Sequence, residues 1–171
     1  MDPATYYDKL MIVGLDEVLQ LPAAMLRDWN ILSIRGRLNE LPLNFPGARS
    51  VKTLHFDDVE SDYPDEHLFA ATPSDIQHAL AFAREIGDAP LLIHCHAGIS
   101  RSTAVAWIII WDKLKPKPDS VGQAFDIVRR ARPILLPNRH VLRLGIAALA
   151  PKETQKSIMQ EFQGCLAELN Y

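Results

Sequence analysis

The stretch "LLIHCHAGISRSTAVAWIIIW", residues 91–111, moves from a short apolar run through a polar loop to a longer apolar run. The segment PLLIHC, 90–95, predicts a buried strand, and residues 102–114 predict a helix. Between them, Gly98 permits a tight or left-handed backbone. This order places Cys95 at the carboxyl end of a strand, which is where ligands bind in open α/β sheets.

The remainder of the chain alternates strands and helices and then ends in helices alone. Thr72, Pro73 and Asp75 form the clearest helix start, with a capping residue, a first-turn proline and a capping-box partner. Asp119 or Ser120 is expected to cap the helix that follows it. The order predicts an α/β fold with a central, mainly parallel sheet. Strands are predicted at 10–13, 30–34 and 51–56, and helices at 15–29 with a break at Pro22, 73–86, 120–131, 139–150 and 152–169.

Length and composition are those of an ordinary globular protein. The 171 residues predict a single domain, 1–171, and the net charge of −3 gives no reason to expect nucleic acid or an anionic membrane as partner. The most apolar segment, Ala104–Trp111, is far shorter than the roughly 20 residues that span a bilayer. Two cysteines, Cys95 and Cys165, and a start without signal-peptide features predict a cytoplasmic protein with reduced thiols. The oligomeric state is left open.

The loop after Cys95 has the features of an anion site. Backbone N–H groups that converge in a curled loop and lead into a helix N-terminus form a nest for a phosphate. Arg101 adds a planar guanidinium that can bind two phosphate oxygens, and the helix dipole opposes a cation at this position unless an anion lies beside it. The residues expected to bind the phosphate are His96, Ala97, Gly98, Ile99, Ser100 and Arg101.

The same positive field favours the thiolate form of Cys95. A thiolate held against phosphorus predicts covalent catalysis, in which the sulfur attacks in line, a phosphocysteine forms, and water then hydrolyses it. Arg101 stabilises the charge on the equatorial oxygens in this scheme. Ser102 is placed to hydrogen-bond the sulfur and to assist its departure in the second step.

This chemistry also needs a proton donor for the leaving oxygen. The segment HFDDVESDYPDE supplies Asp57, Asp58, Asp62 and Asp65. We expect Asp58 to be the acid because it directly follows a strand, and because adjacent like charges favour the protonated form of one partner. Asp57 is the next candidate.

These residues resemble a known family. The motif HCHAGISRS at 94–102 is similar to the signature loop of cysteine-based tyrosine phosphatases, in the variant typical of dual-specificity phosphatases. FDD at 56–58 resembles the segment that holds the general acid in small members, where the second aspartate donates, and RRARPILLPN at 129–138 resembles the segment after the signature helix. The resemblance covers about 50–145; His96 departs from the usual pattern.

The resemblance implies a small tyrosine-phosphatase-like fold, with a central, mainly parallel sheet flanked by helices on both faces. It also implies catalysis without a metal or an organic cofactor. A zinc site at HCH is disfavoured on other grounds, because strand alternation directs His94 and His96 away from Cys95 and no second cysteine–histidine cluster follows. We expect His94 to orient the loop through backbone hydrogen bonds.

Further residues have structural interpretations. Arg132, Pro133 and Asn138 are expected to support the loop from beneath rather than to bind substrate. The apolar run 107–111 is expected in the core with some of it exposed at one end. Cys165 lies in the last predicted helix and is expected to be unreactive.

The substrate is expected to be a phosphorylated protein or a small phosphomonoester. The acidic segment 57–66 should border the site and repel highly phosphorylated ligands, and the loop interior adds only His96 as a potential further cation. Phosphoinositides, inositol phosphates and RNA 5′ ends remain alternative substrates. A phosphate-binding module without turnover is a further alternative, and so is a structural domain with a fortuitous motif.

Overall fold

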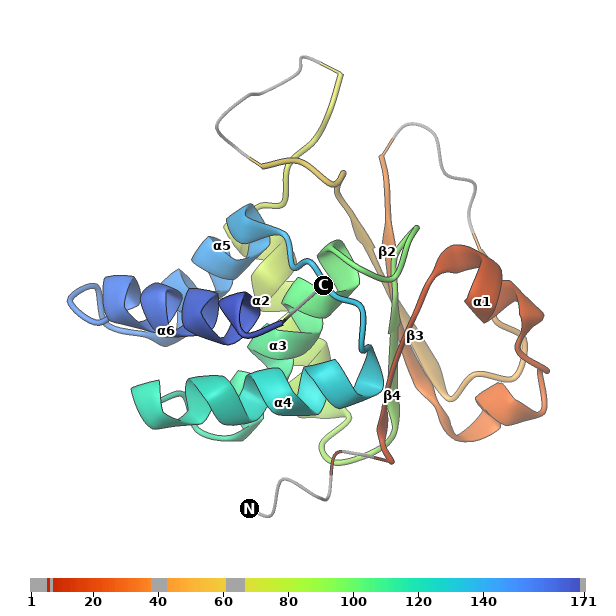
Figure 1. Ribbon diagram of the computed structural model, residues 1–171. Helices are drawn as coiled ribbons and strands as arrows, with labels where there is room; N and C mark the ends of the chain where they lie inside the picture. Colours follow the sequence, from red (N-terminus) through yellow and green to blue (C-terminus); the bar gives the residue numbers. More distant parts are fainter. Residues whose placement is uncertain (1–5, 7, 38–42, 61–66, 170–171) are drawn as a thin grey trace.

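Four short parallel strands form one sheet in the order β1-β4-β2-β3 in the computed structural model, which describes residues 6, 8–37, 43–60 and 67–169 (Figure 1). All four predicted strands are present, with ends that differ by one residue at most. Cys95 is the first residue after β4, at the carboxyl edge of the sheet. The strands are β1 (Leu10–Val13), β2 (Asn30–Arg35), β3 (Ser50–His55) and β4 (Leu91–His94).

Helices cover both faces of the sheet, as predicted, but unequally. Figure 1 shows α1 and η2 on one face and α2 to α6 on the other. The thinner side is held by Val18 and Leu26, which pack with Ile31 and Leu92 of the sheet. The elements on this side are α1 (Leu15–Gln20) and the 3-10 helix η2 (Met25–Asp28). Those on the other are α2 (Pro73–Glu85), α3 (Arg101–Lys113), the 3-10 helix η3 (Pro118–Ser120), α4 (Val121–Ala131), α5 (Arg139–Leu149) and α6 (Gln155–Ala167).

Helix ends follow local chemistry where a side chain can supply it. The Thr72 hydroxyl accepts the Asp75 N–H at 3.4 Å, and Asp75 in turn accepts the Thr72 N–H at 2.8 Å, so the predicted capping box is confirmed. The predicted cap of α4 is wrong. Ser120 occupies the N-cap position, but its hydroxyl donates to the Lys117 carbonyl at 2.9 Å and accepts nothing from the helix.

The predicted break at Pro22 is confirmed, and one further helix boundary differs from the prediction. Residues 15–29 form two short elements, because Pro22 lies in the connection and lacks the N–H that a continuous helix needs there. The last helix starts at Gln155 rather than at 152, since a turn in which the Thr154 N–H donates to the Pro151 carbonyl at 3.0 Å precedes it.

Helix α3 is the centre of the thicker layer. Its apolar run, Ala104–Trp111, is buried throughout, which corrects the expectation that one end of 107–111 is exposed. Trp107 stacks on Trp111 with ring centroids 5.0 Å apart and meets the edge of Phe162 of α6 at 4.8 Å. Because α2, α4 and α5 all pack against it, α3 holds its first residue, Arg101, in a fixed position.

Across the described ranges, none of the helices combines the length and the apolar character needed to cross a bilayer.

Two helical glycines give a matched test of this packing. A Cβ at Gly145 of α5 would lie 2.3 Å from Ile108 side-chain atoms of α3, whereas a Cβ at Gly164 of α6 meets nothing within 4 Å. We expect Gly145→Ala to lower the free energy of unfolding by about 1–3 kcal/mol through overpacking. Gly164→Ala should raise it by up to about 1 kcal/mol through helix propensity. Urea denaturation of both variants measures the free energy of unfolding. A change of the same sign and size in both variants would contradict the packing of α3 on α5.

Candidate active site

The loop between β4 and α3 curls around the sulfur of Cys95. Cys95 is 1% exposed, and its Sγ accepts the Gly98 N–H at 3.3 Å. The same sulfur lies 3.2 Å from the Ser102 Oγ, within hydrogen-bonding distance, so the hydroxyl can donate to a thiolate. Loop, sulfur and first helical turn therefore form one compact unit, with the sulfur at its floor.

Gly98 has no substitute in this loop. Its φ of 72° is in the left-handed region, and a Cβ there would lie 2.5 Å from the Gly14 nitrogen and from the Val13 carbonyl carbon. The loop is thus in close van der Waals contact with the backbone between β1 and α1. The Leu15 N–H of that junction donates to the His96 carbonyl at 2.8 Å.

Other elements hold further loop carbonyls on the outer side. The Arg132 Nη2 donates to the Ala97 carbonyl at 3.2 Å, and the Leu136 N–H donates to the Ile99 carbonyl at 3.0 Å. The Asn138 N–H donates to the Ser100 carbonyl at 3.3 Å. The segment after α4 thus supports the loop, as predicted for Arg132 and Asn138; Pro133 is exposed.

These outer hydrogen bonds determine where the amides point. In a planar trans peptide the C=O of one residue and the N–H of the next point in opposite directions. Carbonyls fixed outward therefore turn the following N–H groups inward, toward the sulfur, and the Gly98 N–H on Cys95 is the directly observed case. By the same argument we expect the N–H groups of Ala97, Ser100 and Arg101 to point inward, because each follows a carbonyl bonded to another element. Such a concave set of donors suits a tetrahedral oxyanion.

Arg101 lies across the same edge of the sheet. Its side chain is 5% exposed, and its Nη1 donates to the Phe56 carbonyl at 3.0 Å, just beyond the end of β3. Because β3 and β4 are parallel members of one sheet, Phe56 and Cys95 both lie at its carboxyl edge. The guanidinium charge is therefore held on the Cys95 side of the molecule.

The two adjacent aspartates have different surroundings. Asp58 is exposed, and its Oδ1 accepts from the Ser100 Oγ at 2.7 Å and from the Asn138 Nδ2 at 2.8 Å. Asp57 instead accepts the backbone N–H of Phe69 at 2.8 Å and that of Arg37 at 3.3 Å. The structure thus brings Asp58 to the loop and uses Asp57 to join backbone segments. The other two predicted candidates, Asp62 and Asp65, lie outside the described residues.

An ion pair that the sequence analysis missed supports the loop. The Arg132 Nη1 donates to both carboxylate oxygens of Glu17 at 2.8 Å, and Glu17 also accepts the Gly14 N–H. The hydrogen bond from Arg132, followed by that from Gly14, holds the pKa of Glu17 below its ordinary value. Because the partners are 115 positions apart, no local pattern indicates the pair.

The two histidines beside Cys95 differ in burial. His94 is fully buried, its Nδ1 is 3.4 Å from the Cys95 carbonyl oxygen, and its ring meets the edge of Phe45, whereas His96 is exposed. Among the residues with described positions, no three His, Cys, Asp or Glu side chains converge as a metal site requires. Burial raises the pKa of Cys165, and nearby carboxylates add to the effect, so its thiol is protonated at neutral pH.

Two hollows flank the Cys95 loop. The α1 hollow, of about 330 Å³, lies on the side of α1, and the entrance hollow, of about 280 Å³, lies on the side of α5. Each combines two carboxylates with one arginine, so neither is strongly basic. The α1 hollow is lined by Gly14, Asp16, Glu17, His96, Ala97 and Arg132. The entrance hollow is lined by Asp58, Glu60, Ser100, Leu136, Pro137, Asn138, Arg139 and Leu166.

Comparison with known proteins identifies the fold. No protein-family model and no curated protein sequence matches the chain. Among solved structures, it is similar to a human tyrosine phosphatase-like serine/threonine/tyrosine-interacting protein, with 20% identity, 82% of this chain and 91% of that one covered, and a TM-score of 0.61. The Yvh1 phosphatase domain from Chaetomium thermophilum has 21% identity, coverage of 94% and 95%, and a TM-score of 0.51. PTPMT1 in complex with PI(5)P has 14% identity, coverage of 89% and 93%, and a TM-score of 0.54.

The chain therefore has the small α/β fold of tyrosine-phosphatase-like and dual-specificity phosphatase-like proteins, as the signature at 94–102 predicted.

The Glu17–Arg132 pair makes a pH-dependent contribution to stability. A lowered folded-state pKa means that the contribution is present above the ordinary value of 4.5 and is lost as the pH falls through the folded-state value. Wild type should therefore be more stable than Glu17→Gln at neutral pH, and the difference should shrink below about pH 4. Thermal denaturation of both proteins from neutral to acidic pH measures this. Glu85→Gln on α2 is the control, and a difference that persists unchanged in acid would contradict the assignment.

Proposed function

We propose that this protein is a phosphomonoester hydrolase that acts through a phosphocysteine intermediate, and that its substrate is a phosphorylated protein, with phosphotyrosine preferred. The observation that carries the proposal is the Gly98 N–H on the buried Cys95 sulfur, in a loop whose carbonyls are bonded to other elements. Phosphate binds where such donors converge, and the same donors favour a thiolate.

In the first step the Cys95 thiolate attacks phosphorus. The S–P bond forms, the bond from phosphorus to the ester oxygen breaks, and Asp58 gives its proton to that oxygen. The loop amides and the Arg101 guanidinium bind the three equatorial oxygens, whose charge is largest in the transition state.

In the second step water attacks the phosphocysteine. Asp58, now a carboxylate, takes a proton from the water, the S–P bond breaks, and inorganic phosphate and the thiolate are released. The Ser102 hydroxyl, 3.2 Å from the sulfur, and the Gly98 N–H stabilise the departing thiolate. Ser102 thus acts on the leaving group of this step.

Burial supports these roles for the nucleophile and the acid. In an in-line displacement the leaving oxygen lies opposite the attacking sulfur. A sulfur at the buried floor therefore requires a proton donor at the exposed mouth. Cys95 is 1% exposed, whereas Asp58 is exposed and is bonded to Ser100 on the loop. Asp57, committed to two backbone N–H groups, fits the role less well.

The surroundings of the mouth support a singly phosphorylated substrate with an apolar portion. Each flanking hollow contains two carboxylates and one arginine, which disfavours a polyanion. After α4, Ile134 is 63% exposed and Leu136 is 71% exposed. The Leu136 N–H is bonded to the Ile99 carbonyl, which places Leu136 beside the loop. Apolar side chains in this position suit the ring of an aryl phosphate.

Two alternatives have an observation in their favour. PTPMT1, which shares the fold, is seen in complex with PI(5)P, so a phosphoinositide or another non-protein phosphate is the alternative substrate. Another protein with this fold is described as tyrosine phosphatase-like and interacting, which favours phosphate binding without turnover. The nucleophile, the arginine and the exposed aspartate together favour turnover.

Replacement of Cys95 tests the proposal as a whole. Wild type should hydrolyse para-nitrophenyl phosphate and a phosphotyrosine peptide faster than inositol hexakisphosphate. Cys95→Ser should lose at least about 10³-fold in kcat and still bind vanadate, because the loop amides remain. Cys165→Ser is the control and should be fully active. Turnover by Cys95→Ser equal to wild type would disprove covalent catalysis, and preference for the hexakisphosphate would disprove the substrate class.

The two aspartates give a second test. Asp58→Asn should lower kcat by about 10²- to 10⁴-fold for phosphotyrosine and by less for a better leaving group, because only the general acid is lost. Asp57→Asn should lower the thermal midpoint with a smaller effect on kcat, since it weakens the contacts to Phe69 and Arg37. Steady-state kinetics with leaving groups of different basicity measure the first effect. A larger loss of kcat in the Asp57 variant would reverse the assignment.

A further inference from the structure

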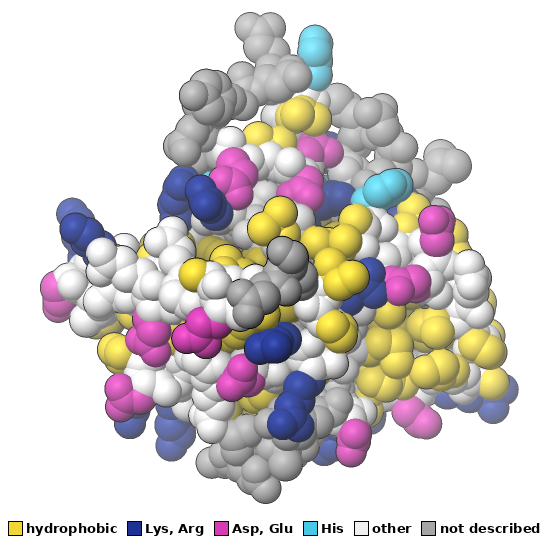
Figure 2. Space-filling view, in the orientation of Figure 1, with side chains coloured by type: hydrophobic (Ala, Val, Ile, Leu, Met, Phe, Trp, Pro, Cys, Tyr) yellow, Lys and Arg dark blue, Asp and Glu magenta, His cyan; other side chains and the backbone are white. Residues whose placement is uncertain are grey.

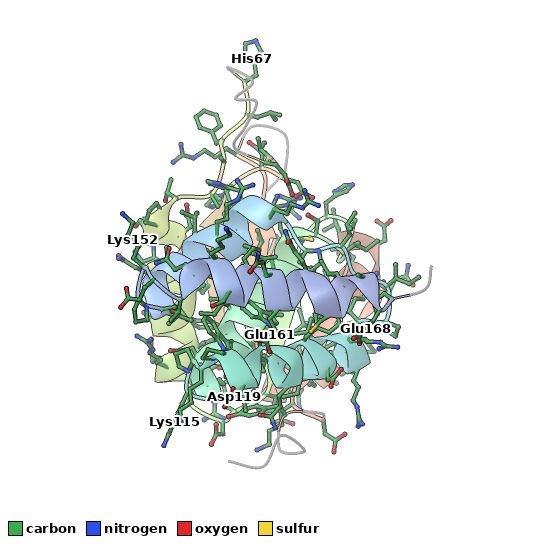
Figure 3. All side chains as sticks on the ribbon, turned by 60° about the vertical axis from the view of Figure 1, so that its left-hand side comes forward. His67, Lys115, Asp119, Lys152, Glu161 and Glu168 are labelled. Carbon is green, nitrogen blue, oxygen red and sulfur yellow. The ribbon has the colours of Figure 1, made fainter. Side chains whose placement is uncertain are left out.

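A further hollow lies between α5 and α6 and is separate from the two beside the Cys95 loop. Its volume is about 560 Å³, and we call it the basic hollow. The two helices are joined by the short turn that follows Leu149, and they lie side by side in Figures 1 and 3. The basic hollow is lined by Arg143, Ile146, Lys152, Gln155, Lys156, Met159, Gln160 and Gln163.

The basic hollow and the entrance hollow share the same two helices. Arg139 of α5 and Leu166 of α6 line the entrance hollow, next to Asp58 and Ser100. Since the first residue of α5 and the end of α6 line one hollow, the two helices run antiparallel. The entrance hollow therefore lies at one end of the pair, and the basic hollow lies farther along it.

Helical spacing aligns the linings of the two hollows, and we call the surface between them on α5 and α6 the α5/α6 groove. Arg139, Arg143 and Ile146 are spaced four and three residues apart on α5, which places them on one face. On α6, Met159, Gln163 and Leu166 follow the same spacing. One stripe on each helix thus runs from the entrance hollow to the basic hollow. The α5 stripe covers seven residue steps, or about 10 Å.

The groove has a charge opposite to that of the whole protein. The lining of the basic hollow includes three cations, three glutamines and no carboxylate, although the net charge of the chain is −3. Glu161 of α6 and Glu168 directly after it lie near Cys165 and Asp126 of α4, and Figure 3 shows both on the α4 side of the helix. Glu153, in the turn before α6, is exposed and does not line the hollow. Lys152 lies at the start of the α6 segment, away from Glu161 and Glu168.

The shape of the groove favours a polypeptide over a membrane. Its apolar residues are largely buried: Ile146 is 2% exposed and Met159 is half-buried. Membrane insertion requires apolar side chains that protrude from the surface, so these residues cannot provide it. Glutamine amides can donate to and accept from the backbone of an extended chain. Lys152 and Lys156 are exposed and can pair with carboxylates. An acidic, extended segment of a protein fits this combination.

We propose that the α5/α6 groove binds an acidic segment of the phosphoprotein substrate, with Lys152 and Lys156 pairing with its carboxylates. This inference rests on the proposed function for the identity of the partner. Lys156 is ten residue steps, or about 15 Å, along α6 from Leu166 of the entrance hollow, and Lys152 lies farther away. An extended chain advances about 3.3 Å per residue, so the carboxylates should lie about four to six residues from the phosphorylated residue. Asp58 and Glu60 in the entrance hollow disfavour a carboxylate directly beside that residue.

Binding without phosphate tests the groove independently of catalysis. The probe is a fluorescein-labelled, unphosphorylated, glutamate-rich peptide, and the readout is its fluorescence anisotropy with the full chain. The double variant Lys152→Glu/Lys156→Glu should weaken binding at least about 10-fold. Lys115→Glu/Lys117→Glu, with the same change of charge at exposed positions of the turn after α3, should bind as wild type does. An equal loss in both variants, or none in either, would overturn the proposal.

Kinetics test the link to the substrate. For a phosphotyrosine peptide with two glutamates about five residues away, Lys152→Glu/Lys156→Glu should raise KM about 10-fold and leave kcat unchanged. Hydrolysis of para-nitrophenyl phosphate should be unchanged, because this substrate does not reach the groove. A second peptide with the two glutamates adjacent to the phosphotyrosine should have a higher KM with wild type. An equal KM for the two peptides would contradict the proposed spacing of about five residues.

The remaining outcomes separate this proposal from its alternatives. If wild type hydrolyses no substrate but binds the acidic peptide through Lys152 and Lys156, the proposed function fails and the groove is supported as a docking site alone. If vesicles of phosphatidylserine and phosphatidylcholine bind more tightly than the peptide and depend on the same lysines, the groove is a membrane contact and the proposal is overturned.

Discussion

Hydrogen bonds to the outer carbonyls of the Cys95 loop are the constraint on which the site depends. The His96 carbonyl is held by the start of α1, and the Ala97 and Ile99 carbonyls are held by the segment after α4. Each fixed carbonyl orients the amide that follows it, so elements on opposite sides of the loop turn its N–H groups toward the sulfur. The sulfur receives one of these N–H groups directly, from Gly98. The candidate anion site is therefore a product of the packing around the loop.

The N-terminal ends of α3 and α5 position further side chains around the Cys95 loop. Arg101 is the first residue of α3, and the apolar run of this helix is fully buried. The packing of α3 in the core therefore fixes the backbone position of Arg101. Asn138 caps α5 by accepting the Val141 N–H at 2.9 Å, and its amide donates to Asp58. The helix that positions the expected acid also forms one wall of the proposed substrate groove. Chemistry at the mouth and recognition of a partner would then share one rigid element.

Several features could be predicted because they are local. The strand–loop–helix order at 90–114, the capping box at Thr72 and the need for glycine at position 98 follow from residue types a few positions apart. At two places local rules left a choice. The Ser120 hydroxyl had carbonyls of the preceding turn within reach and bonded to one of them instead of capping α4. Asp57 and Asp58 are adjacent carboxylates, and only the contacts with Phe69 and Ser100 distinguish them.

The sequence by itself determined the α/β class and the position of Cys95 at the carboxyl end of β4, because periodicity and turn chemistry depend on near neighbours. It also predicted a nucleophile and an arginine there. The tertiary structure alone decided that Glu17 pairs with Arg132, that Leu136 bonds to Ile99, and that a hollow with a basic lining lies between α5 and α6. Those contacts join residues far apart in the chain, and they exist only once side-chain packing has fixed the positions of whole helices against the sheet.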